Sequence, residues 1–261
     1  MKKHYFQEIT KKILLSINGE EKNLASNSLK LENIKKFVIE IIEKSDRDNA
    51  NIFTVIKLLT DKITFTNTLS VIETYNTTLG HYQSFSFDYL ITIDDLPKEI
   101  WKFFYNIATN LSGFNDAINI DLGVDPILPT VWERGRLSKC LAMIGTENNR
   151  WKEDESNHYI DLFLPMGVAI VHGGNHSITT GMIKCDGIIK VGKGTHNNIY
   201  DISALYDFMK FNGTYYVRSS DNSIICKANS FEFGCIFEIG RIIKDSNISF
   251  IDHKVDWGVK T

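Results

Sequence analysis

Apolar residues recur at the spacing of an α-helix through the first 80 residues of the chain. The three stripes are Ile9, Ile13, Leu14 and Ile17; Leu31, Ile34, Phe37, Val38, Ile41 and Ile42; and Ile52, Val55, Ile56, Leu59 and Ile63. Polar stretches at 18–28 and 45–51 separate these stripes. The pattern predicts three helices in an N-terminal region, residues 1–80, which we expect to serve oligomerisation or partner binding.

From residue 81 onward the pattern mixes strand and helix signals. Alternating aromatic and β-branched residues predict a strand at 85–93, and Asp94-Asp95-Leu96-Pro97 is a helix start. Further strands are expected at 159–164, 168–171 and 187–191, and a hairpin is expected at 214–217 and 224–227. Helices are expected at 132–144, 177–184 and 202–209, while 231–243 fits either state. Residues 81–261 are therefore predicted to form one α+β domain.

Composition narrows the class of protein. The chain has 261 residues, 43% of them hydrophobic, and a net charge of −3, which does not favour bulk binding to nucleic-acid phosphates. Its four cysteines form no C-x-x-C pair, so we expect reduced thiols in a cytoplasmic protein. A charged N-terminus and the lack of an apolar run of ~20 residues predict neither a signal peptide nor a membrane span.

The segment with the most candidate chemistry is Gly173-Gly174-Asn175-His176-Ser177, here named the glycine–histidine motif. It follows an apolar strand and precedes a predicted helix. Since a helix N-terminus presents free backbone N–H groups, this layout predicts a site for phosphate or another anion. The alternative is a tight strand-to-helix turn in which Asn175 and Ser177 only cap the helix.

The sequence does not favour a metal site or a nucleophilic catalytic site. His172 and His176 are four residues apart, but glycines interrupt the helix that would align them, and His158 or His196 would have to complete a metal site. We therefore predict hydrogen-bonding histidines and no metal. There is no G-x-S-x-G nucleophile motif, and no residue is assigned as catalytic.

Residues 187–195 nearly match a phosphate-binding loop. However, Gly194 stands where a Ser or Thr would hold magnesium, and the preceding Ile-Ile-Lys-Val is typical of a strand. The segment is therefore predicted to be a strand followed by a turn.

Residues 120–183 resemble the ParB/sulfiredoxin-like superfamily. The matching parts are Asp125-Pro126-Ile127-Leu128-Pro129 with Trp132, Arg134 and Arg136, followed by Gly174-Asn175-His176-Ser177. The resemblance implies a core with a mixed sheet. It also implies that the motif, Arg134 and Arg136 contact a phosphate.

The chain departs from this superfamily at two positions of the motif. Ser177 replaces the arginine that contacts phosphate, and Asn175 stands where sulfiredoxins carry the catalytic cysteine and ParB proteins a glutamate. Without a thiolate or a carboxylate, catalysis of either kind loses its nucleophile or its charge stabilisation. Arg134 or Arg136 would have to supply the missing cation.

The sequence therefore favours a non-catalytic binding protein with a protein partner, self-associating through its N-terminal helices. Its Lys, Ile and Asn content is typical of AT-rich genomes, so a phage or mobile-element protein acting on a nucleic-acid-processing or host-defence complex is one hypothesis. The alternative is a nucleotide-binding or phosphoester-hydrolysing enzyme. In that enzyme the motif holds phosphate, His176 donates a proton or contacts the phosphate, and Arg134 or Arg136 clamps the charge. No cofactor is assigned.

Overall fold

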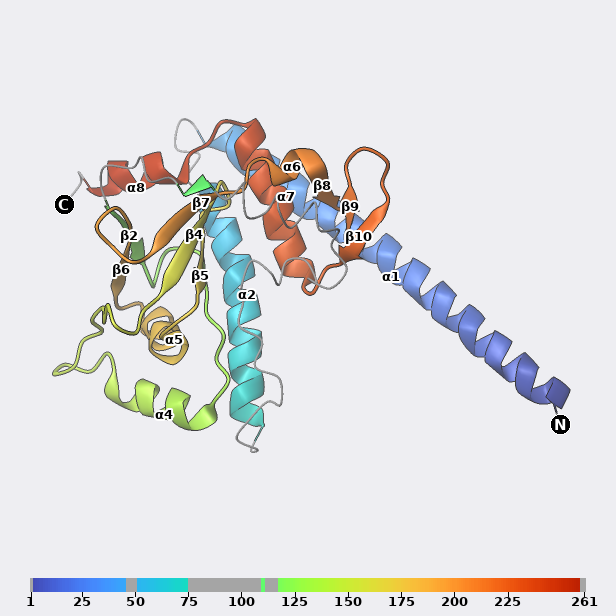
Figure 1. The fold of residues 1–261 in the computed structure, drawn as a ribbon, viewed down its shortest axis with the longest axis horizontal. Coiled ribbons are helices and arrows are strands. Elements are labelled where there is room, and N and C mark those ends of the chain that lie inside the picture. Colours follow the sequence, from blue (N-terminus) through green and yellow to red (C-terminus); the bar gives the residue numbers. More distant parts are fainter. Residues whose placement is uncertain (1, 46–50, 75–108, 111–116, 259–261) are drawn as a thin grey trace.

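Two long helices form the N-terminal part of the computed structural model, which describes residues 2–45, 51–74, 109–110 and 117–258. Helix α1 (Lys2–Lys44) is continuous and α2 (Asn51–Glu73) follows it (Figure 1). The prediction of three helices is wrong, because the polar stretch 18–28 continues α1. That stretch contains the helix formers Glu, Lys, Leu and Ala and no proline, so polarity alone does not end the helix.

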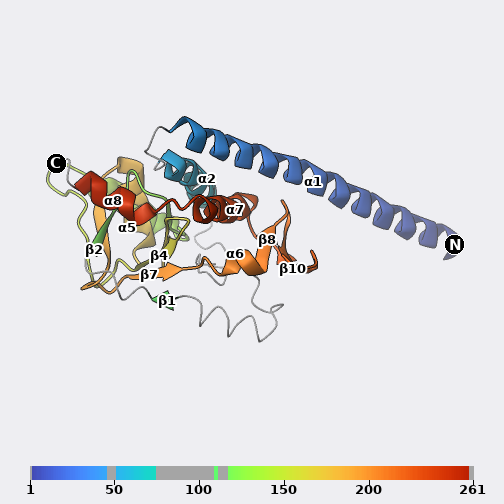
Figure 2. The ribbon, with the colours of Figure 1, turned by 90° about the horizontal axis from the view of Figure 1, so that it is seen from above.

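Helix α7 (Phe231–Asp245) lies against both α1 and α2 (Figures 1 and 2). The hydroxyl of Ser230 accepts a hydrogen bond from the Phe233 N–H and so caps its start. Residues 233–240 are all buried, which explains why the apolar run fitted both helix and strand in the sequence. After α7 comes α8 (Phe250–Gly258), whose Phe250 ring packs edge-on against Phe53 of α2 at 4.9 Å.

The main sheet has five strands in the order β1-β7-β4-β5-β3 and contains both parallel and antiparallel pairs. Strands β4 and β5 are antiparallel, with Ile160 opposite Val171, while β7 runs parallel to β4 and β3 parallel to β5. The strands are β1 (Thr109–Asn110), β3 (Ile127–Leu128), β4 (Ile160–Leu164), β5 (Val168–Val171) and β7 (Asn198–Asp201). With the helices, this mixed sheet confirms the α+β class.

Two smaller antiparallel sheets complete the strands. The first pairs β2 with β6, and the second contains β8, β9 and β10. Pairing of β9 with β10 confirms the hairpin predicted at 214–217 and 224–227. These strands are β2 (Ala117–Asp121), β6 (Ile188–Gly192), β8 (Met209–Phe211), β9 (Tyr215–Arg218) and β10 (Ile224–Lys227).

The helix predicted at 202–209 is shorter than expected. Helix α6 (Leu205–Phe208) is a single turn, because Met209 already begins β8. The strand predicted at 85–93 and the helix predicted to begin at Asp94 lie outside the described residues. Among the described helices, none is both long enough and apolar enough to cross a membrane.

One buried core joins the helices to the main sheet. It includes Ile52 and Ile56 of α2, Ile236 of α7 and most of β4 and β5. Next to the sheet, α4 (Arg134–Met143) and α5 (Asn175–Lys184) pack against each other. The glycine–histidine motif lies where β5 leads into α5, the second helix of this pair.

Candidate functional site

The two glycines of the motif form the turn between β5 and α5. Gly174 is the N-cap of α5 and has a φ of +73°, a left-handed conformation that favours glycine. A Cβ at Gly173 would lie 2.5 Å from the Asn157 carbonyl oxygen, and one at Gly174 would overlap the ring of His158. Only glycine therefore lets the turn pack this closely against residues 157–158.

Asn175 and Ser177 do not cap the helix, so the capping role is wrong, although the tight strand-to-helix turn is present. Asn175 is instead buried in the first turn of α5, where its Oδ1 accepts a hydrogen bond from the Thr130 N–H at 2.6 Å. The Ser177 hydroxyl donates to the Gly174 carbonyl oxygen at 2.9 Å. The first helical hydrogen bond runs from Ile178 N–H to the same oxygen, which leaves three N–H groups before it without a helical or side-chain acceptor.

His158 packs against this turn and contacts Ser177. Its Nδ1 accepts the Asp154 N–H at 2.9 Å, so the proton resides on Nε2, which lies 2.8 Å from the Ser177 Oγ. The indole of Trp151 stacks on the imidazole at 4.7 Å, and burial lowers the pKa of His158. In this tautomer His158 donates a hydrogen bond to Ser177 and cannot take its proton.

His176 is also a neutral, buried hydrogen-bond acceptor. Its Nε2 accepts the Glu133 N–H at 3.2 Å, and its ring packs edge-on against Trp132 at 4.3 Å. Burial, together with the nearby Arg136 cation, lowers the pKa of His176. Because Glu133 is the N-cap of α4, this bond fixes the start of that helix to α5.

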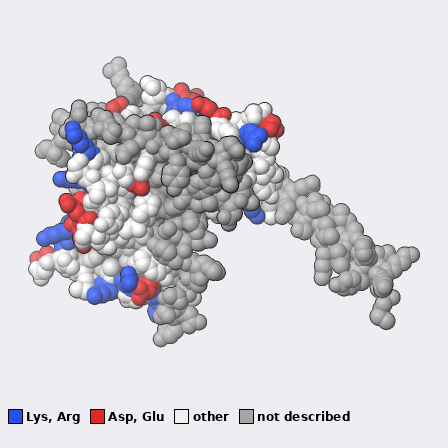
Figure 3. Space-filling model, in the orientation of Figure 1, with Lys and Arg blue, Asp and Glu red and all other residues white. Residues whose placement is uncertain are grey.

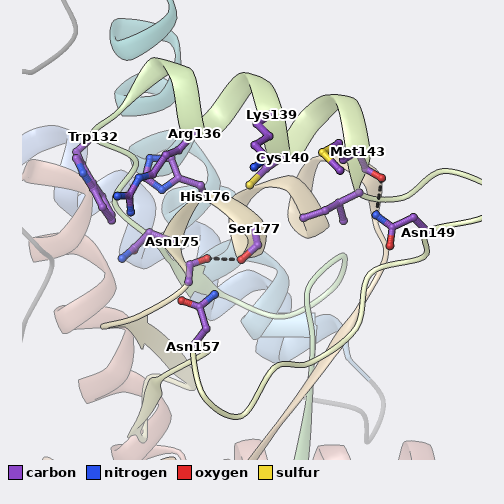
Figure 4. Close-up of a pocket in the computed structure, with 12 residues that line it drawn as sticks. Trp132, Arg136, Lys139, Cys140, Met143, Asn149, Asn157, Asn175, His176 and Ser177 are labelled. Carbon is purple, nitrogen blue, oxygen red and sulfur yellow. Dashed lines mark hydrogen bonds between the residues drawn. The ribbon is translucent and has the colours of Figure 1, made fainter.

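A pocket of about 360 Å³ opens between α4 and the start of α5 (Figure 4). Helix α4 contributes one face to it, with lining residues at the i, i+3, i+4 and i+7 positions of a single stripe. The lining residues are Trp132, Arg136, Lys139, Cys140, Met143, Ile144, Asn149, Asn157, Gly174, Asn175, His176 and Ser177. The structure thus brings four residues of the motif and Arg136 together in one site.

The pocket carries positive charge. The Arg136 Nε pairs with Glu133 at 2.7 Å, which leaves its two terminal nitrogens outside that bond, and its guanidinium lies 5.8 Å from the Trp132 ring centre. Lys139 follows one turn later. Figure 3 shows Lys and Arg side chains, with acidic side chains among them, along the lower edge of the molecule, where α4 lies. Arg134, the other predicted cation, is exposed on α4 but does not line the pocket.

One buried donor at the pocket has no acceptor. Asn175 is 1% exposed, and its Nδ2 makes no hydrogen bond although its Oδ1 does. A buried amide left unpaired costs free energy, so such groups are uncommon in native proteins and often mark the place of an unseen partner.

His172 and His196, the other histidines weighed as metal ligands, serve other contacts. His172 pairs with Asp161 through Nε2 at 2.9 Å, and the His196 Nε2 lies 2.9 Å from the His158 carbonyl oxygen. Within the described part of the chain, no group of three or more His, Cys, Asp or Glu residues could hold a metal ion.

Six lining residues were not predicted from the sequence as parts of the site: Lys139, Cys140, Met143, Ile144, Asn149 and Asn157. The α4 residues could have been found from their spacing. It places a basic pair, Arg136 and Lys139, and an apolar pair, Cys140 and Met143, on one face of the helix. Asn149 and Asn157 come from a loop whose course no local pattern specifies.

Fold and pocket together define an α+β protein with a basic pocket at the start of a helix. The chain belongs to the family of unknown function DUF6710, which matches residues 15–250. No curated protein and no solved structure matches it. The resemblance to the ParB/sulfiredoxin-like superfamily stays a prediction.

Proposed function

We propose that this protein binds a phosphate group, or a similar tetrahedral anion, between α4 and α5 and does not turn the ligand over. The observation that carries the proposal is the convergence of donors on one pocket. Arg136, Lys139 and the uncapped first turn of α5 all line it. Cations and free helical N–H groups together are the usual elements of an anion site.

The state of the polar side chains favours binding over catalysis. Ser177 receives a hydrogen bond from His158 and lacks an adjacent base, so it is not activated as a nucleophile. Burial raises the pKa of the Cys140 thiol, which keeps it protonated at neutral pH. Both groups line or border the pocket without the activation that acyl or phosphoryl transfer requires.

The test is calorimetric titration of the protein with inorganic phosphate. The wild-type protein should bind phosphate, and Arg136→Gln should weaken binding about tenfold or more, because a charge-assisted hydrogen bond contributes roughly 1.5–3 kcal/mol. Arg134→Gln is the matched control, since it removes the same charge from the same helix outside the pocket. Equal binding by both variants, or none by the wild type, would refute the proposal. Phosphate release from p-nitrophenyl phosphate above the buffer rate would refute its non-catalytic part.

We also propose that α1 mediates contact with a second copy of the chain. Its N-terminal half extends away from the other elements in both views (Figures 1 and 2), and Leu29 and Phe37 on the same helix are more than half exposed. Exposed large apolar residues on a projecting helix favour association.

Light scattering across a concentration series tests this second proposal. The wild-type protein should show a mass of at least two chains, and the Leu29→Ser/Phe37→Ser variant should shift toward the monomer. Leu69→Ser, which changes an exposed leucine on α2, should leave the mass unchanged. A monomer at every concentration would contradict the proposal.

A further inference from the structure

The pocket is much larger than one anion requires. Taking the ~30 Å³ share of a water molecule as a guide, a phosphate with its five heavy atoms fills roughly 100–150 Å³. The pocket holds about 360 Å³ and falls within the size range of sites for small organic ligands. The volume beyond the anion therefore needs a further ligand group.

The lining changes in character along α4. Arg136, Trp132 and His176 lie at one end of the pocket, while Met143 and Asn149 lie at the other (Figure 4). Cys140, Met143 and Ile144 follow the two cations along the chain and form an apolar wall of the pocket. Met143 is 53% exposed, so a ligand group that covers it removes apolar surface from water.

Asn149 lies at the apolar end of the pocket. The Asn149 Nδ2 donates to the Met143 carbonyl oxygen at 2.7 Å, which fixes the amide and leaves its Oδ1 outside that bond. At the charged end, the buried Nδ2 of Asn175 is a donor without an acceptor. Donors thus gather at the end of the pocket where α5 begins.

From this order of groups we infer that the ligand is an organic phosphomonoester. Its phosphate lies against the first turn of α5, Arg136 and Lys139, and its organic part lies along Cys140, Met143 and Ile144. The inference rests on the proposed anion binding and names its ligand class. A tetrahedral dianion fits two cations and several N–H groups better than a carboxylate, which has one charge and two oxygens.

The test compares three probes by calorimetric titration: inorganic phosphate, phenyl phosphate and benzoate. For the wild-type protein, phenyl phosphate should bind about tenfold more tightly than phosphate, because the ring covers apolar wall. Benzoate should bind more weakly than phenyl phosphate. Met143→Ser should reduce the preference for phenyl phosphate several-fold and leave phosphate binding unchanged. Ile183→Ser, at an exposed isoleucine of α5 outside the pocket, should change neither.

The outcomes separate this inference from the proposed function. Equal affinity for phosphate and phenyl phosphate would overturn the inference and leave anion binding intact. Benzoate binding as tight as that of phenyl phosphate would overturn the phosphate class. If Met143→Ser weakens phosphate and phenyl phosphate equally, the apolar wall does not hold the organic part. If none of the probes binds, both proposals fail.

Discussion

The glycine–histidine motif and the glycine-rich segment 187–195 both place glycines at positive φ. The angle is +73° at Gly174, and it is +126° at Gly187, +100° at Gly192 and +80° at Gly194. Around Gly174 the chain is tightly packed, since a Cβ there would overlap His158. Around Gly194 nothing lies within 4 Å of the position a Cβ would take. The turn at Gly174 is thus fixed by the packing around it, whereas the turn at Gly194 is held by hydrogen bonds within residues 192–197.

The two segments also differ in the use of their backbone donors. In segment 187–195 the Gly192 N–H donates to the Asn197 carbonyl oxygen and the Thr195 N–H donates to the Gly192 carbonyl oxygen, so two backbone donors of this turn are used locally. In the motif, the N–H groups of the first turn of α5 precede the first helical bond at Ile178. Backbone N–H groups without acceptors beside a pocket therefore distinguish the candidate anion site. Glycine and positive φ do not, because they occur in both segments.

The largest expected effect is that of Gly174→Ala. The new methyl group meets the His158 ring and forces a left-handed alanine, which together should lower the free energy of unfolding by about 2–5 kcal/mol. Gly194→Ala is the control, because it carries the backbone strain without the overlap and should cost about 1 kcal/mol. Urea unfolding monitored by circular dichroism measures both. Equal losses in the two variants would show that packing around the motif is not what distinguishes it.

The parts of the fold that the sequence predicts are those set by local pattern. Such patterns are short apolar runs and alternation of polar and apolar residues. They occur in β4, β5 and the hairpin of β9 and β10, which lie within about a residue of their predicted positions. The strand-and-turn prediction for 187–195 is confirmed by β6 and the bond from Thr195 to Gly192. The continuity of α1 was missed, because a polar surface stretch and a polar linker look the same in one chain.

The candidate site was only partly predictable for a different reason. The motif itself is local, so its strand–glycine–helix layout could be predicted. Its partners are not local: Thr130, Glu133 and His158 meet it across 19 to 45 residues of chain. Asn175 and Ser177 make two of those contacts instead of capping α5. Only the orientation of α4 shows that Arg136 lines the pocket and Arg134 does not.

A smaller effect on the free energy of unfolding is expected from a change in pH. Folding lowers the pKa of His158 and His176 below the ordinary value of 6.5, so between the folded and unfolded values the unfolded chain binds more protons. Stability from both groups is therefore fully present above about pH 6.5 and is lost as the pH falls below it. Each protonation also removes an acceptor, from the Asp154 N–H at His158 and from the Glu133 N–H at His176.

Urea unfolding of the wild-type protein at pH 7.5 and 5.0 should show this loss at the lower pH. His176→Gln keeps an amide acceptor but no titratable group, so its stability should fall less over the same interval. Gly194→Ala, changed in the other glycine segment, should retain the full wild-type pH dependence. If His176→Gln also retained it, the acid sensitivity would arise elsewhere in the chain. The contrast between a motif held by neutral histidines and a turn held by hydrogen bonds within residues 192–197 would then rest on His158 alone or need another physical basis.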